Sequence, residues 1–87
     1  MKITDCRPEV QDFACAMEIV LRDNDHKGGW QGCSEAYLER RLVEELDEYF
    51  STLPISDKTR TLKEIVDVAN FAMMLWDIHR TSPRPPV

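Results

Sequence analysis

Glycine is scarce in this sequence, with three residues among 87, and none of them belongs to a glycine-rich loop of the kind that cradles phosphate. Lysine and arginine are not concentrated in any segment, and 16 acidic against 11 basic residues give a formal net charge of -5. A nucleic-acid polymer binds proteins through clustered basic residues. The composition therefore excludes a polymeric nucleic acid as the expected partner.

Cysteines in pairs and long apolar runs are also lacking. The three cysteines, Cys6, Cys15 and Cys33, are odd in number and show no CxxC spacing, which excludes a disulfide framework and a zinc site as predictions. No apolar stretch reaches the length of a signal peptide or the roughly 20 residues of a membrane span. We expect a cytoplasmic protein with reduced thiols and no membrane contact.

Hydrophobic spacing predicts helices throughout, and no segment shows the alternation of a strand. A first helix is expected from about Pro8 to Asp23, followed by a loop over residues 23–32, which are rich in turn-forming residues. Ser34 is expected to cap a second helix that stops before Pro54. The apolar stripe of this second helix comprises Leu38, Leu42, Leu46, Tyr49, Phe50 and Leu53.

The third helix is predicted to run to about His79, starting either at a Thr61–Glu64 capping box or one turn earlier, near Asp57. Its apolar residues cover two sides: one holds Leu62, Ile65, Val66, Ala69, Ala72, Met73 and Trp76, and the other holds Phe71, Met74, Leu75 and Ile78. A helix that is apolar on two sides must be buried on two sides. We therefore predict an all-α fold, in which one three-helix chain completes a helical bundle by forming a homodimer or a higher homo-oligomer.

The length of the chain suits one domain, expected over residues 1–80, with a proline-rich flexible tail over residues 81–87. A domain of this size buries a limited fraction of its surface. Burial against a second copy is consistent with that limit.

Two pairs of acidic residues stand out on the second and third helices. Glu45 and Glu48 are three residues apart on one helix, and Glu64 and Asp67 are three apart on the other. Glu45 lies at the border of its apolar stripe, and Glu64 and Asp67 lie within the apolar arc of Phe71, Met74 and Ile78, with no basic residue of their own helix expected beside them. Four carboxylates brought together away from water need a neutralising partner, and an all-oxygen ligand set favours Mg2+ or Mn2+.

A simpler interpretation stays open for each pair. Glu-x-x-Glu is common on solvated helix faces, and Glu64 alone is equally explained as the acidic member of a capping box. With both pairs taken together, and the second pair on an apolar arc, the metal site and the simpler interpretation are about equally supported.

The ordered motif resembles a known family. Glu45-Leu46-Asp47-Glu48, followed after fifteen residues by Glu64-Ile65-Val66-Asp67, is similar to the ExxE...ExxD signature of the MazG-like, all-α nucleoside triphosphate pyrophosphohydrolases. Flanking segments, including Lys27-Gly28-Gly29-Trp30, extend the resemblance over roughly residues 26–77. The resemblance implies a dimeric helical bundle that holds Mg2+ on Glu45, Glu48, Glu64 and Asp67 and hydrolyses a nucleoside triphosphate to the monophosphate and pyrophosphate. Glu48 would be the catalytic base, and Glu45 would support it as a ligand.

Three further residues are candidates for contact with the substrate. Asn70 could hydrogen-bond the sugar or a phosphate, Lys27 could meet a phosphate, and Trp30 could stack on the base. Each has an alternative: Asn70 on an exposed strip with Lys63 and Asp77, Lys27 solvated, and Trp30 folded back on the bundle.

The chain also departs from the family pattern, because it is shorter than most members and few basic residues follow the second motif. A second hypothesis is therefore kept: a non-catalytic helical dimer that acts as a nucleotide-binding or protein-interaction module.

Overall fold

The computed structural model describes residues 1–52 and 57–82. These residues form three α-helices, α1 (Pro8–Asp23), α2 (Glu35–Thr52) and α3 (Lys58–Thr81), and two short 3-10 helices, η1 (Ile3–Asp5) and η2 (Asp25–Lys27). The described part of the chain contains no strand. The all-α prediction is confirmed, and α1 has the predicted bounds.

Side chains at the helix starts set the boundaries of α2 and α3. The Ser34 hydroxyl oxygen accepts a hydrogen bond from the Tyr37 amide at 3.1 Å, as expected for the residue that caps α2. The Asp57 carboxylate accepts from the Arg60 amide at 2.8 Å, so α3 begins at the earlier of the two predicted positions. A start at Thr61 is wrong, because the Thr61 hydroxyl lies inside the first turn and donates to the Asp57 carbonyl at 3.1 Å.

The far end of α3 lies slightly beyond its predicted end near His79. Thr81 is the last helical residue, and its hydroxyl donates to the Asp77 carbonyl at 2.8 Å, one turn back. Thr81 therefore belongs to the helix and not to the predicted tail. Residues 83–87 of that tail, and Leu53 of the predicted α2 stripe, lie outside the described residues.

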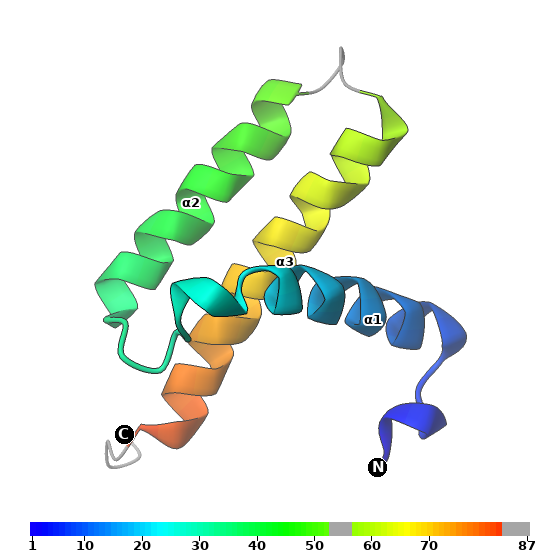
Figure 1. The fold of residues 1–87 in the computed structure, drawn as a ribbon, viewed down its shortest axis with the longest axis horizontal. Helices are drawn as coiled ribbons and strands as arrows, with labels where there is room; N and C mark the ends of the chain where they lie inside the picture. The colour runs from blue at the N-terminus through cyan, green and yellow to red at the C-terminus, as the bar shows by residue number, and fades with distance from the viewer. Residues whose placement is uncertain (53–56, 83–87) are drawn as a thin grey trace.

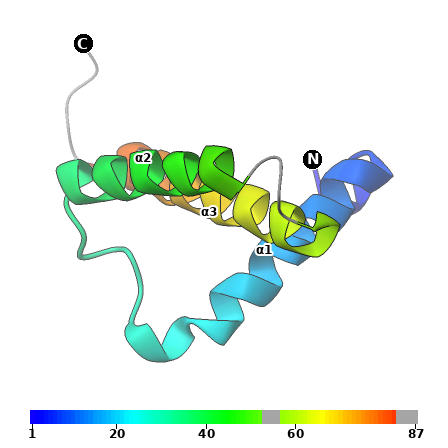
Figure 2. The ribbon, with the colours of Figure 1, turned by 90° about the horizontal axis from the view of Figure 1, so that it is seen from above.

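The long helix α3 is the centre of the arrangement, because it packs against both of the others. α2 and α3 lie side by side in opposite directions, and α1 crosses α3 (Figure 1). Seen from above, the end of α1 and η2 stand to one side of the α2–α3 pair, and the segment before α2 spans the distance back to it (Figure 2). Gly28 makes the turn after η2 with φ of 91°, a conformation that glycine adopts without steric cost.

The hydrophobic core of a single chain is small. Leu38, 1% exposed, and Val66, 8% exposed, are the buried hydrophobic residues among those described. The radius of gyration is 14.5 Å, whereas a compact chain of this length would have about 12 Å. One copy of the chain therefore leaves much of its apolar surface uncovered.

Part of that uncovered surface is formed by six exposed side chains on α2 and α3. We call it the apolar face, and it consists of Val43, Leu46, Phe50, Leu62, Ile65 and Trp76, all of them exposed. Their spacing places one stripe along each helix. On the predicted side of α3 that includes these residues, the structure buries Val66 and leaves Leu62, Ile65 and Trp76 exposed.

Candidate functional site

Three of the four predicted acidic ligands meet between α2 and α3. One carboxylate oxygen from each of Glu45, Glu48 and Glu64 lies within 4.8 Å of the others. Glu45 is 6% exposed and Glu64 is 8% exposed, whereas Glu48 is exposed. The cluster thus has two members withdrawn from water and one that water can reach.

The two buried members have unsatisfied oxygens. Glu45 Oε2 and Glu64 Oε2 are buried without a hydrogen-bond partner. A buried acceptor left unpaired is costly, and a buried carboxylate without full compensation costs more. Two carboxylates with unpaired oxygens, and a third at this spacing, are a donor set that a hard divalent cation such as Mg2+ or Mn2+ can use. The residues present therefore fit the cation that the sequence predicts.

Asp67, the fourth predicted ligand, stands beside this cluster but is not one of the three oxygens that converge. Its Oδ2 accepts from Lys63 Nζ at 3.0 Å. The expectation that no basic residue of its own helix lies next to Asp67 is wrong, because Lys63 is one helical turn before it. Asp67 remains close enough to Glu45 to raise the pKa of that residue.

Burial and neighbouring charge change the acidity of Glu45. Desolvation, followed by repulsion from Glu48 and Asp67, raises its pKa from 4.5 to about 7, although the nearby Arg41 lowers it. A carboxyl group with this pKa is partly protonated near neutral pH. Without a cation, the cluster therefore keeps part of its charge neutralised by a proton.

This raised pKa predicts how stability depends on pH in the absence of metal. The folded state binds more protons than the unfolded state between pH 4.5 and about 7, so the free energy of unfolding should fall as pH rises through that window. Urea denaturation in EDTA from just above the isoelectric point to pH 8 would measure the slope. The same series with Glu45→Gln should give a shallower slope, and equal slopes would show that Glu45 is not the titrating group.

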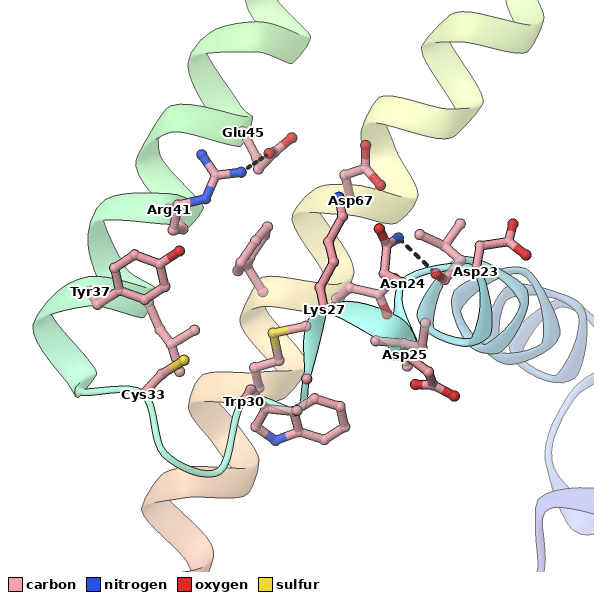
Figure 3. Close-up of a pocket in the computed structure, with 18 of the residues that line it drawn as sticks. Asp23, Asn24, Asp25, Lys27, Trp30, Cys33, Tyr37, Arg41, Glu45 and Asp67 are labelled. Atoms are coloured by element: carbon pink, nitrogen blue, oxygen red, sulfur yellow. Dashed lines mark hydrogen bonds and ion pairs between the residues drawn. The ribbon is translucent and has the colours of Figure 1, made fainter.

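A cleft of about 670 Å³ opens next to the cluster, between α2, α3 and the segment from the end of α1 to Cys33. Its volume is within the range of small-ligand sites. Glu45 and Asp67 line it, and so do all three predicted substrate residues, Lys27, Trp30 and Asn70. In the view of Figure 3, Glu45 points from α2 toward α3, and Lys27 extends from η2 toward Asp67 on α3.

Asn70 lies in the wall of the cleft, at the place where α1 crosses α3. It is 3% exposed, and its Nδ2 donates to the Met17 carbonyl at 3.3 Å. Its Oδ1 is buried without a partner. The alternative that placed Asn70 on an exposed strip is wrong, because the crossing of α1 covers it.

Trp30 is folded back on the bundle and lines the cleft at the same time. Its indole Nε1 donates to Asp77 Oδ2 at 2.9 Å, which joins the loop before α2 to α3. Arg80 holds the other oxygen of Asp77 at 2.9 Å. The hydrogen bond from Trp30, together with Arg80, lowers the pKa of Asp77. The ring is therefore held in place, whereas Lys27 is exposed and carries no such contact among the described residues.

Arg41 is a cleft residue that the sequence reasoning missed. Its Nη2 donates to Glu45 Oε1 at 2.8 Å, its Nη1 donates to Glu44, and its guanidinium lies over the Phe71 ring at 5.0 Å from the centroid. Hydrogen bonding to Glu44 raises the pKa of Arg41, despite its partial burial. Arg41 precedes Glu45 by four residues, as Lys63 precedes Asp67, and this spacing of oppositely charged residues was the signal that could have revealed both.

Comparison with known proteins gives one relative and no family. The chain is 38% identical to a protein of Archaeoglobus fulgidus, described as an uncharacterized protein, over 60 residues that make up 69% of this chain and 64% of the relative. This chain thus spans less than two thirds of the length of the relative. No family model matches the chain, and no solved structure matches it.

Among the described residues, no helix combines the length and the apolar character that a membrane span requires.

Proposed function

We propose that this protein is a magnesium-dependent nucleoside triphosphate pyrophosphohydrolase of the MazG-like type, acting as a homodimer. One observation carries the proposal: Glu45, a buried carboxylate with an unpaired oxygen, converges with Glu48 and Glu64 and also lines a cleft whose other lining residues suit a nucleotide. The products would be a nucleoside monophosphate and pyrophosphate. The match of the motif to the family signature supports this reaction.

The four acids have separate roles in this proposal. Glu45, Glu48 and Glu64 would hold the cation through their converging oxygens, and Asp67 would join them from the cleft. Magnesium, or manganese in its place, would offset the phosphate charge and orient the attacking water. An exposed carboxylate can also serve as the proton acceptor, because the attacking water must be able to reach that group.

Glu48 is the best candidate for that proton acceptor. It is the exposed member of the cluster, so a water molecule can approach it without opening the fold. As the water oxygen bonds to the α-phosphorus, its proton would pass to Glu48. The bond between the α-phosphorus and the oxygen bridging to the β-phosphorus breaks, and the electron pair leaves with pyrophosphate.

The other substrate residues divide by their chemistry. The free Oδ1 of Asn70 can only accept a hydrogen bond, which suits a sugar hydroxyl better than a phosphate oxygen. Lys27 is a cation at the cleft and suits a phosphate. The ring of Trp30 lines the cleft while its polar edge is held by Asp77, which leaves the ring available to stack on a base.

Homodimerisation is supported by the apolar face. None of its six side chains lines the cleft, so a second copy could cover it without closing the site. The accessible surface of 6842 Å² exceeds the roughly 5,300 Å² expected for a monomer of this mass. That excess, about 1,500 Å², is about twice the roughly 800 Å² that one partner buries in a standard stable interface.

Release of pyrophosphate from a panel of canonical and modified nucleoside triphosphates, with Mg2+, tests the proposal. Wild type should release it, while Glu48→Gln and Asp67→Asn should not. Asp47→Asn is the matched control, because Asp47 lies beside Glu48 on α2, is exposed and does not line the cleft. Absence of release from every substrate, in a folded protein that binds Mg2+, would overturn the proposal.

A second candidate function follows from the apolar face itself. A non-catalytic dimer that binds nucleotide or another protein would need this face and would not need the acids. Such a module would release no pyrophosphate in the assay above. Its acid variants would still bind its ligand and form its dimer.

A further inference from the structure

Two positively charged side chains that line the cleft are paired with two of the proposed metal ligands. Arg41 donates to Glu45 at 2.8 Å, and Lys63 donates to Asp67 at 3.0 Å. Each pair consists of two residues that line the cleft, one positive and one negative. With no divalent cation, these pairs supply part of the neutralisation that the acids require.

This neutralisation is incomplete. Arg41 reaches only Oε1 of Glu45, and Oε2 of Glu45 and of Glu64 stay unpaired. The side chain of Lys63 is 65% exposed, and ion pairs with one exposed member contribute little to stability. A divalent cation on these carboxylates would therefore replace weak partners with a stronger one.

Arg41 could not leave the cleft when its pairing with Glu45 is replaced. Arg41 is 29% exposed, and its guanidinium is held over Phe71 and by Glu44, neither of which belongs to the acidic cluster. Lys63 extends from α3 beside Asp67. Next to a bound divalent cation, Lys63 would lose its partner and Arg41 would keep only Glu44, so both positive charges would repel the cation unless an anion bound between them.

We propose that Arg41 and Lys63 form a polyphosphate-binding subsite, an inference that rests on the proposed function. In this subsite each side chain exchanges a carboxylate partner for phosphate oxygens. Without metal they pair with Glu45 and Asp67, and with metal on these acids they bind the non-bridging oxygens of the triphosphate. The planar guanidinium suits two phosphate oxygens at once, and the ammonium acts as a point charge. Metal and polyphosphate should therefore each strengthen the binding of the other, by the same factor.

Calorimetry with inorganic tripolyphosphate tests the subsite. The probe is titrated as its magnesium complex at fixed free Mg2+, and separately in EDTA, into wild type, Arg41→Gln, Lys63→Gln and Arg41→Lys. Wild type should bind the probe at least tenfold more tightly with Mg2+. Arg41→Gln and Lys63→Gln should each lose about tenfold of the affinity measured with Mg2+, and Arg41→Lys should lie between, because it keeps the charge and loses the planar fork.

A titration with Mg2+ alone separates an exchange of partners from a structural role. If Arg41 and Lys63 compete with Mg2+ for the acids, Arg41→Gln and Lys63→Gln should leave the affinity for Mg2+ unchanged or raise it. If the two side chains instead support the shape of the site, the same variants should lower that affinity. Arg40→Gln is the matched control, because Arg40 is adjacent, pairs with Glu44 at 3.8 Å and does not line the cleft. Circular dichroism of each variant verifies folding.

Three outcomes would overturn the subsite: no effect of Mg2+ on tripolyphosphate binding by wild type, variants that bind the probe as wild type does, or variants with weaker Mg2+ binding. These outcomes are distinct from failure of the proposed function. Coupled binding without release of pyrophosphate from any nucleotide would keep the subsite and reject the hydrolase. Release of pyrophosphate with unchanged probe affinity in the variants would do the reverse.

Discussion

Replacing Glu45 with Gln is expected to abolish magnesium-dependent release of pyrophosphate while making the metal-free protein more stable above pH 7. Among the residues that the structure describes, Glu45 is the one acid that belongs both to the converging cluster and to the lining of the cleft. Loss of an outer partner of a metal ligand costs about 10–100-fold in affinity or activity. Loss of a ligand itself should cost at least about 100-fold.

The gain in stability has a different cause. Glutamine keeps the shape of the side chain and removes the charge whose burial raises the pKa of Glu45 to about 7. Urea denaturation in EDTA at pH 8 measures the gain, and a thermal shift with Mg2+ measures the loss of metal binding. Because activity falls while stability rises, misfolding cannot account for the loss.

Glu44→Gln is the control for this experiment. Glu44 also pairs with Arg41, but it does not line the cleft and is not one of the converging acids. This variant should keep both activity and the shift with Mg2+. Equal losses in the two variants would show that the arrangement of Arg41, and not a metal site at Glu45, is what matters.

The second large effect concerns the apolar face. Phe50→Glu should convert a dimer of the 10.1 kDa chain into a monomer. Phe50 is 64% exposed on the apolar face, so the substitution costs little in a single chain. In a dimer it would bury a charge without a partner, at about 3 kcal/mol or more, which weakens association by at least about 100-fold.

Light scattering over a range of protein concentrations measures this change. Ile19→Glu is the control: Ile19 is 61% exposed on α1, outside the apolar face and the cleft, and the variant should stay dimeric. A wild-type protein that is monomeric at every concentration would reject the interpretation of this face. Dissociation of both variants would place the interface partly on α1.

Local patterns predicted the helices well, because a helix start depends on a few adjacent residues. Ser34 and the spacing of apolar residues were enough to place α2, and Pro8 and the turn-rich segment after Asp23 bounded α1. The start of α3 was ambiguous because Asp57 and Thr61 both suit a cap. The side chain of Asp57 decided it by accepting the Arg60 amide.

The candidate site was predicted in part, and the part that was missed depends on contacts between helices. The pairing of Glu45 with Glu48, and the burial of Glu64, followed from positions on single helices. The burial of Asn70 depends on where α1 crosses α3, and its bond to Met17 joins residues 53 apart. The bond between Trp30 and Asp77 joins residues 47 apart. No local spacing encodes either contact.

The two tryptophans of the chain lie at different places, Trp30 in the cleft and Trp76 on the apolar face. Indole fluorescence depends on the polarity around the ring, so the protein carries one intrinsic optical probe for each proposed event. With Trp76→Phe, the remaining emission would report a ligand entering the cleft. With Trp30→Phe, it would report a second copy arriving on the apolar face, so that binding and assembly can be followed separately without any added label.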